Sequence, residues 1–291
     1  MIEVLGSHAF LGALRDVAAP GESVMFRGKL EVEGENIRCY IKPFPSMLVG
    51  ESNEVGENRS VISEALGYVL GKACGFTVAR KAGVIFLRSE QIPGAALRKL
   101  VDQTPGKMVQ DEYLAWFSED MRHSSLMSEC PSDAPELMRQ RNIARIAADL
   151  AAHESSPRIV SFDEWTENSD RHLGNILSAP NGGLTLIDHG RLFRHPSWSP
   201  GKLGKNPRVA RNALMELIDS HDPDWSSRTP IRSARSLAYK SFSVAWKSEA
   251  RTQAELILRE FMEPPEVSLV LEFLTERLDP SQYTPRVGLM L

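Results

Sequence analysis

The chain has 291 residues, of which 42% are hydrophobic and 25% are charged, an ordinary globular composition with enough length for a large core or two lobes. Its formal net charge is −4, and this balance excludes a global electrostatic footprint for nucleic acid. Three widely spaced cysteines, no signal-peptide pattern and no apolar run near the roughly 20 residues of a membrane span predict a soluble, cytoplasmic protein with reduced thiols.

The first part of the sequence predicts mainly strands. Two strand-like runs cover residues 22–32 and 37–42, and the turn signal Glu-Gly-Glu-Asn at 33–36 joins them. Strand character returns at residues 78–87, and 115–117 form a further short apolar run. We therefore expect a sheet in roughly the first 115 residues.

One helix interrupts these strands, and further helices dominate from about residue 134. Asn58 can cap a helix that starts near Val61, because the apolar residues that follow recur at helical spacing until Gly75. An irregular connection is expected at residues 196–207, which are rich in Pro, Gly and Ser. The later predicted helices are 135–153, 212–218, 234–250, 253–261 and 268–278, the last of them followed by a Pro-containing tail.

The most informative stretch lies between the two parts. Asp170 and Asn175 are five positions apart in Asn-Ser-Asp-Arg-His-Leu-Gly-Asn. In the kinase catalytic loop this spacing places an Asp that orients the attacking hydroxyl and an Asn that holds magnesium. The sequence thus predicts Asp170 as a catalytic residue and Asn175 as a metal ligand.

A second motif follows at Asp188-His189-Gly190, at the end of an apolar run. Its place matches the metal-binding Asp-Phe-Gly of kinases. The Asn-Gly pair at 181–182 predicts a hairpin between residues 176–177 and 184–187. A hairpin there brings Asp188 beside Asn175, and both offer the hard oxygen ligands that magnesium prefers.

These two motifs resemble the HipA-like kinases, in the block from Phe162 to Leu177 and again in Ile-Asp-His-Gly at 187–190. The Asp-Arg-His-x-x-Asn block is also similar to that of the phosphatidylinositol 3/4-kinases. The resemblance is specific only from about residue 162 to 190. It implies a protein-kinase-like fold, ATP and magnesium as cofactors, a protein serine or threonine as substrate, and an antitoxin as a possible partner.

A strand-rich front, a helical rear and this motif between them predict an α+β fold of two lobes, residues 1–115 and 116–291. In the front lobe Lys42 ends a predicted strand, as the phosphate-binding lysine of Val-Ala-Ile-Lys does. A solvated strand-end lysine is the alternative. Glu64, in the first turns of the predicted helix, is the candidate partner of Lys42, although acidic residues favour helix N-termini in any case.

The nucleotide-binding residues outside these motifs are less distinct. The adenine-binding hinge is predicted at residues 116–119, with Phe117 and Glu119 as candidate contacts, and a core strand end is the alternative. No Gly-x-Gly-x-x-Gly precedes Lys42, so the phosphate-covering loop is sought at 19–23 or at 6–8. Some HipA-like kinases phosphorylate a serine of this loop, which would be Ser23 or Ser7 here.

Four further side chains of the motifs have open roles. His172 is a second candidate catalytic residue, although a lone histidine more often braces a loop. His189 replaces a phenylalanine and so has no assigned packing role. Arg171 is expected to contact a phosphate or to stabilise the loop, and Asn168 to contact the base or the substrate.

Three alternatives remain at this point. The first is a lipid or small-molecule kinase, although no basic membrane patch is evident. The second is a pseudokinase that acts as a binding module, against which the full set of motif residues argues. The third is a metal-dependent hydrolase built on His172, Asp188, His189 and His195, whose spacing fits no helical metal motif and leaves Asn175 unexplained.

Overall fold

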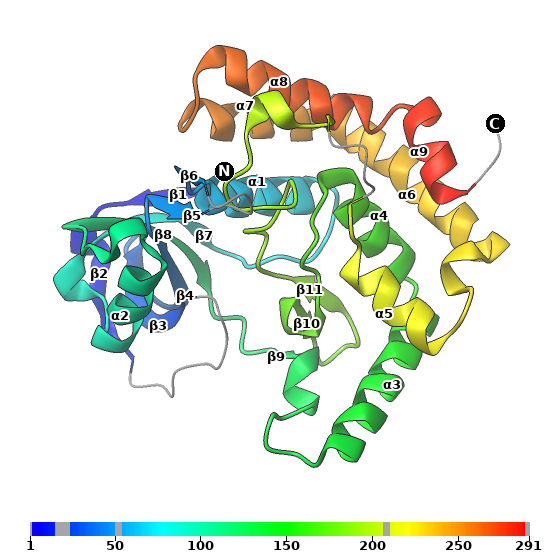
Figure 1. The fold of residues 1–291 in the computed structure, drawn as a ribbon, viewed down its shortest axis with the longest axis horizontal. Helices are drawn as coiled ribbons and strands as arrows, with labels where there is room; N and C mark the ends of the chain where they lie inside the picture. Colours follow the sequence, from blue (N-terminus) through cyan, green and yellow to red (C-terminus); the bar gives the residue numbers. More distant parts are fainter. Residues whose placement is uncertain (1, 15–23, 50–53, 206–209, 289–291) are drawn as a thin grey trace.

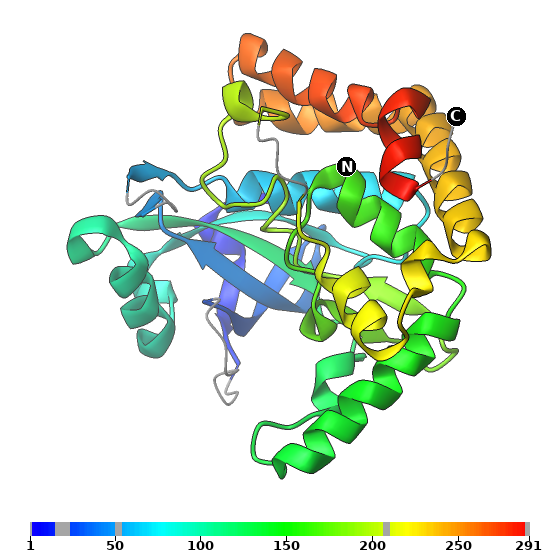
Figure 2. The same ribbon diagram turned by 45° about the vertical axis from the view of Figure 1, so that its right-hand side comes forward.

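The computed structural model describes residues 2–14, 24–49, 54–205 and 210–288. The expected α+β class is confirmed, with strands concentrated in the first 120 residues and helices in the second half. Figures 1 and 2 show a curled sheet on one side and helices stacked beside and above it. In the described part of the chain, no helix has both the length and the apolar character needed to cross a bilayer.

Six strands form the main sheet in the order β1-β7-β8-β4-β3-β2. Only the pair β1 and β7 is parallel, and the other neighbours are antiparallel. The expected hairpin is confirmed, because β3 and β4 pair along their lengths and meet at the turn Glu33-Gly34. The strands are β1 (Glu3–Leu5), β2 (Phe10–Ala13), β3 (Phe26–Val32), β4 (Glu35–Phe44), β7 (Ala82–Arg88) and β8 (Glu112–Glu119).

The two faces of this sheet pack against different helices. Ile41 of β4 lies opposite Phe117 of β8, and both join a core with Leu100 of α2 (Gly94–Gln103). The next pair, Lys42 and Trp116, projects to the other face, where Trp116 joins the core that includes α1. Because side chains alternate along a strand, this register decides that Lys42 faces α1.

Helix α1 (Ser60–Ala73) lies between the sheet and the helical half of the molecule, so nearly all of its residues are buried (Figure 1). Its start is as expected, because the Asn58 Oδ1 accepts a hydrogen bond of 3.0 Å from the Ser60 N–H. Its end also agrees, since Gly75 has φ of +73°, the left-handed conformation that stops helices. A small hairpin of β5 (Met47–Val49) and β6 (Val55–Glu57) precedes it.

A second, smaller sheet carries the motif region. The predicted hairpin is confirmed as β10 (Ile176–Ser178) and β11 (Leu184–Leu186), and β9 (Ser124–Ser125) pairs with the other edge of β10. Before this sheet come α3 (Glu136–Ala152) and α4 (Ser156–Thr166). Helix α4 was not predicted, and its mostly buried sequence lacks the amphipathic periodicity that would have indicated it.

Among the remaining helices, α6 packs against α4, α7 packs against α1, and α5 packs against α3 (Figure 2). They are α5 (Ala213–His221), α6 (Thr229–Ala245), α7 (Arg251–Arg259), α8 (Pro264–Glu276) and α9 (Pro280–Val287). Two predictions here were wrong. A π-helical turn at Trp246–Ala250 joins α6 to α7 without a break, and α8 is not the last helix, because α9 forms in the Pro-containing tail with Pro280 in its first turn.

The expected boundary between residues 115 and 116 falls inside β8, which continues to Glu119. Ala115 and Trp116 both pair with β4, so the chain leaves the sheet only after Glu119. Strand length therefore places the change from sheet to helix a few residues later than composition indicated.

Candidate active site

Lys42 is the centre of a cluster of charged side chains contributed by distant parts of the chain. Its ammonium lies 3.1 Å from the Glu64 Oε1 and 2.7 Å from the Asp188 Oδ1. The first carboxylate comes from α1 and the second follows β11, so three elements meet at one amine. The structure thus brings together three of the residues that the sequence singled out.

Glu64 does more than hold the lysine. Its second oxygen, Oε2, accepts a hydrogen bond of 2.7 Å from the His189 N–H, so one buried carboxylate binds both Lys42 and the backbone of the Asp-His-Gly motif. Burial raises the pKa of Glu64 to about 7 against the opposing charge of Lys42. The ionised form of Glu64 therefore depends on its two hydrogen-bond donors, the Lys42 ammonium and the His189 N–H.

The charges of Lys42 and Asp188 are set by each other. Burial alone would lower the pKa of Lys42, but the carboxylates of Asp188 and Glu64 raise it above its ordinary value. Burial acts against ionisation of Asp188 as well, yet the Lys42 ammonium lowers the pKa of Asp188 to about 2. At neutral pH Lys42 is a cation and Asp188 an anion.

The backbone of the motif is shaped to present Asp188. Asp188 has φ of +55°, in the left-handed region that residues other than glycine enter rarely and often at functional sites. The next glycine permits close packing, because a Cβ on Gly190 would lie 3.2 Å from the Glu64 Oε1 and 3.3 Å from the Lys42 Nζ. A side chain at Gly190 would crowd the ion cluster.

His189 packs into the interior rather than toward the cavity. A Cβ on Gly67 of α1 would overlap the Cβ and Cγ of His189, so the imidazole lies directly on the helix backbone. Burial lowers the pKa of His189 well below its usual value, and the ring is therefore neutral. Its Nδ1 is 3.1 Å from the Arg171 Nη2, which donates to it, and its ring meets Phe162 edge-on.

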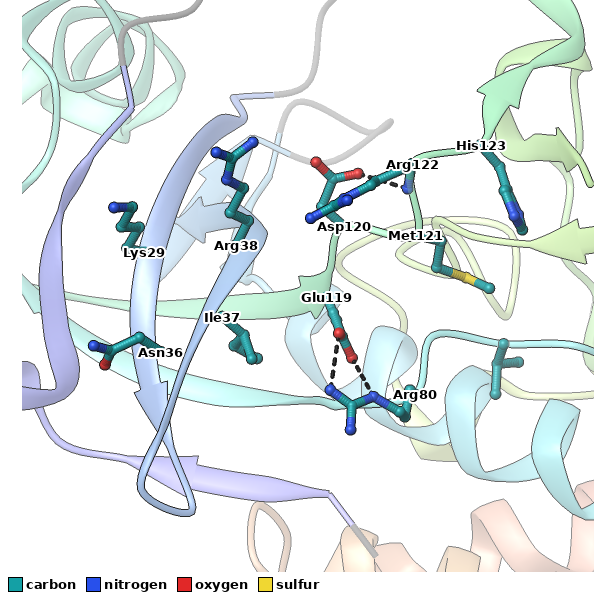
Figure 3. Close-up of a pocket in the computed structure, with 11 residues that line it drawn as sticks. Lys29, Asn36, Ile37, Arg38, Arg80, Glu119, Asp120, Met121, Arg122 and His123 are labelled. Atoms are coloured by element: carbon teal, nitrogen blue, oxygen red, sulfur yellow. Dashed lines mark hydrogen bonds and ion pairs between the residues drawn. The ribbon is translucent and has the colours of Figure 1, made fainter.

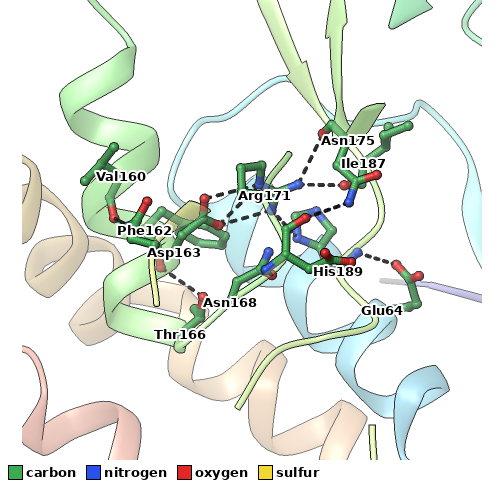
Figure 4. Close-up of polar contacts among 12 residues, drawn as sticks. Glu64, Val160, Phe162, Asp163, Thr166, Asn168, Arg171, Asn175, Ile187 and His189 are labelled. Atoms are coloured by element: carbon green, nitrogen blue, oxygen red, sulfur yellow. Dashed lines mark hydrogen bonds and ion pairs between the residues drawn. The ribbon is translucent and has the colours of Figure 1, made fainter. Parts of the chain in front are cut away.

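Arg171 holds the two motifs together (Figure 4). Its guanidinium is fully buried and donates to both carboxylate oxygens of Asp163 in α4 at 3.2–3.3 Å. It also donates to the carbonyl oxygens of Asn175 and Ile187, at 3.2 and 2.6 Å. Of the two roles expected for Arg171, these contacts fit the one that stabilises the loop.

The partner carboxylate was not among the predicted site residues. Burial raises the pKa of Asp163 to about 6, while the Arg171 charge opposes the shift. The sequence held one signal for this pair: an acidic residue inside the block that resembles HipA-like kinases. Without a predicted helix at residues 156–166, nothing indicated that Asp163 points at the motif.

Asn175 and Asp170 lie side by side as the five-residue spacing predicts. The Asn175 Nδ2 donates to the Asp170 carbonyl oxygen at 2.8 Å, which leaves the Asn175 Oδ1 available as an acceptor. The Ile187 N–H donates to the Asn175 carbonyl oxygen at 3.2 Å, so the residue before Asp188 is tied to the loop.

Asn168 is buried, and its Oδ1 accepts a hydrogen bond of 3.1 Å from the Asp170 N–H. Asn168 therefore supports the loop instead of facing a ligand.

A cavity of about 390 Å³ joins these groups. Lys42, Asp170 and Asp188 line it together with Gly190 and Arg191. The Arg191 Nε lies 3.6 Å from the Asp170 Oδ2, and both side chains are more than one-third exposed. The cavity therefore has two carboxylates, of Asp170 and Asp188, and two cations, of Lys42 and Arg191, within reach of a polar ligand.

His172 is exposed, and its Nδ1 accepts a hydrogen bond of 2.9 Å from the Gly174 N–H. It caps the turn that leads to Asn175, as the bracing role predicts. Because His172 braces this turn and His189 is buried against Arg171, these two histidines do not form a common ligand set with Asp188. Of the four residues of the hydrolase alternative, Asp188 and His195 line the cavity of Lys42, and His172 and His189 are engaged in these other contacts.

The predicted hinge residues Phe117 and Glu119 do not line the cavity of Lys42. Phe117 is fully buried in the core on the α2 face, so its side chain does not reach the cleft. Glu119 lines a second, larger cavity of about 720 Å³, where it accepts two hydrogen bonds from Arg80 at 3.0 and 3.1 Å (Figure 3). Size alone would favour the larger cavity as the ligand site, but the motif residues Lys42, Asp170 and Asp188 line the smaller one.

The two candidate phosphate-covering segments are placed differently. Residues 19–23, with Ser23, lie outside the described residues. Ser7 lies in a short turn, and its carbonyl oxygen accepts a hydrogen bond of 2.8 Å from the Gln91 side chain. Ser7 does not line the cavity of Lys42.

Comparison of the chain with known protein families found no match, and comparison with curated proteins found none either.

Proposed function

We propose that this protein is an ATP- and magnesium-dependent kinase that transfers the γ-phosphate to a serine or threonine hydroxyl of another protein. The observation that carries the proposal is the Lys42 ammonium between Glu64 and Asp188, in the cavity that Asp170 also lines. Phosphoryl transfer is mostly positioning and charge neutralisation, and it needs these groups in one place.

The residues present suit a nucleotide-bound magnesium ion. Asp188 carries an ionised carboxylate that is one-quarter exposed, and the Asn175 Oδ1 has no hydrogen bond within the described part of the chain. Both are hard oxygen donors, and magnesium sites usually take their other ligands from phosphates and water. When bound, the ion would neutralise charge that develops on the phosphate oxygens.

The roles of the chain's own side chains follow from their positions. Lys42 would bind the α- or β-phosphate once the nucleotide draws it from Asp188, while Glu64 keeps it oriented. Asp170 would accept the proton of the acceptor hydroxyl while the hydroxyl oxygen bonds to the γ-phosphorus and ADP leaves. Arg191 would move from Asp170 to the transferred phosphate.

The two-lobe arrangement belongs to this proposal. The sheet up to Glu119 would act as the N-terminal lobe and the helical part as the C-terminal lobe, with nucleotide between them. The chain segment Glu119–Arg122 would form the hinge, and its backbone would face the base, since Phe117 is turned into the core. Membership among the HipA-like kinases, and with it an antitoxin partner, rests on the motif resemblance.

A small-molecule kinase is the second candidate, and one observation favours it. Leu48 of β5 and the end of α2 at Asp102 and Gln103 also line the cavity of Lys42. These walls would restrict access for a folded protein acceptor more than for a small polyol or amine.

The test is phosphate transfer from γ-labelled ATP to the protein itself and to proteins in a cell extract, with magnesium and with a chelator. Label on a protein in the magnesium sample, absent with Asp170→Asn, supports the proposal. Label found only on small molecules favours the second candidate. No transfer and no ATP-dependent shift in the melting temperature would remove both.

A further inference from the structure

A third cavity touches α1 from outside the candidate active site. It has a volume of about 330 Å³ and lies between the first turn of α1, the strands β7 and β8, and the end of β4. Its lining is mainly apolar. The apolar lining residues are Phe44, Pro45, Val61, Ile62, Phe86, Leu114 and, from the chain just after α7, Phe261.

The rim of this cavity carries exposed apolar side chains. Phe86 is 45% exposed and Met108 is 69% exposed, and Val109 and Met47 are exposed as well. The Gln110 Nε2 donates to the Ser46 Oγ at 2.5 Å, which holds the segment of Met108 and Val109 beside Met47. Exposed apolar side chains gathered near an apolar cavity mark interaction sites more often than scattered single residues do.

The charge beside the apolar patch is negative. Glu112 lines the cavity and Asp111 precedes it, and in the described ranges neither carboxylate has an ion pair. Arg88 of β7 lies opposite Glu112 of β8 in the sheet, but its ion pair is with Glu90, where the Arg88 Nη1 lies 3.7 Å from the Glu90 Oε1. An occupant with basic residues next to an apolar anchor would complement this rim.

We propose that this cavity is a docking site for a segment of a partner protein that presents one aromatic side chain flanked by lysine or arginine. The aromatic ring fills the space between Phe86 and Val61, and the basic residues pair with Glu112 and Asp111. Such an anchor in a pocket with a charged rim is the usual anatomy of a binding hot spot.

Occupancy of the docking site acts on the ion cluster through two contacts. Phe44 is a shared wall, because it lines both cavities and its ring centroid lies 5.6 Å from the Lys42 ammonium. Val61 and Ile62 lie three and two residues before Glu64 on α1. A bound aromatic ring therefore stabilises the position of α1 in which Glu64 reaches Lys42.

The experiment measures binding without nucleotide, so it does not depend on kinase activity. The probe is a short fluorescein-labelled peptide with a central phenylalanine flanked by lysines, titrated with the full chain and followed by anisotropy. Matched peptides carry alanine for the phenylalanine or glutamate for the lysines. The variants Phe86→Ala and Glu112→Lys change exposed residues of the site, and Val244→Ala and Glu154→Lys are exposed controls elsewhere.

We expect the phenylalanine–lysine peptide to bind, and Phe86→Ala and Glu112→Lys to weaken it by about tenfold each, while the controls leave it unchanged. Bound peptide should also slow hydrogen exchange in the first turns of α1. Equal binding by the site variants and the controls would overturn the proposal, as would tighter binding of the glutamate peptide. A concentration-dependent dimer that Phe86→Ala abolishes would assign the patch to a second copy of the chain.

Discussion

The ammonium of Lys42 lies 2.7 Å from a carboxylate oxygen of Asp188, although 146 positions separate them in the chain. The lysine comes from the main sheet and the aspartate from the loop after β11. Their contact joins the two parts of the molecule at the point where the motifs predict nucleotide phosphates. The pair is therefore the natural target for functional tests.

Asp170→Asn should abolish phosphoryl transfer without unfolding the protein. The Asp170 carboxylate is the candidate acceptor for the hydroxyl proton, a role worth about 10²–10⁴-fold in rate. Its side chain is 41% exposed, so the substitution should change the melting temperature little. Transfer from labelled ATP is the readout, and more than roughly a tenth of wild-type activity would contradict the assignment.

ATP should raise the melting temperature much more with magnesium than with a chelator. Asp188 and Asn175 supply too few ligands for magnesium without phosphates, and bound ligand stabilises the native state by mass action. Asp188→Asn should reduce the magnesium-dependent part of the shift. A shift of the same size in magnesium and in chelator for the wild-type protein would contradict the metal role.

Gly67→Ala should destabilise the protein and impair the site, because the new methyl group overlaps the Cβ and Cγ of His189. Overpacking of this kind costs typically about 1–3 kcal/mol. Gly71→Ala on the same helix is the matched control, since its Cβ would lie 3.5 Å from the nearest atom of Val78 and fits. Urea unfolding of both variants checks this, and equal stabilities would show that the contact with His189 is not tight.

Arg171→Ala should cost about 3–5 kcal/mol of the free energy of unfolding, because it leaves the Asp163 carboxylate buried without its partner. The loss should also free the carbonyl oxygens of Asn175 and Ile187 and loosen the loop of residues 170–175. Arg145→Ala removes an exposed guanidinium that also has carboxylate partners and should cost less than about 1 kcal/mol. Comparable losses for both variants would mean that burial of the Arg171 pair does not matter.

Glu64 should make the stability depend on pH between about 4.5 and 7. Its pKa is raised from 4.5 to about 7 in the folded protein, so in this range the folded state holds more protons than the unfolded state. The free energy of unfolding should then fall as the pH rises through the window. Glu64→Gln should flatten this dependence, measured by urea unfolding at several pH values, and an unchanged slope would assign it to other groups.

The sequence alone determined the local elements of the site. The Asn-Gly turn fixed the β10–β11 hairpin, and the Asp170 to Asn175 spacing placed the two residues in one turn. Asn58 and Gly75 marked the ends of α1. These features depend on turn conformation, capping and periodicity over a few residues, so the information lies within the segments themselves.

Tertiary structure decided which side chains face the site and which lie buried. The strand at Phe117 was expected correctly, but pairing with Ile41 turns Phe117 into the core, and a shift of one residue would have reversed this. Arg171 was expected to contact a phosphate or to stabilise the loop, and nothing in the sequence indicated that it is fully buried in an ion pair with Asp163 of the unpredicted helix α4. A buried guanidinium is stable only when its charge and donors are matched, and those partners come from elements that no local pattern brings together.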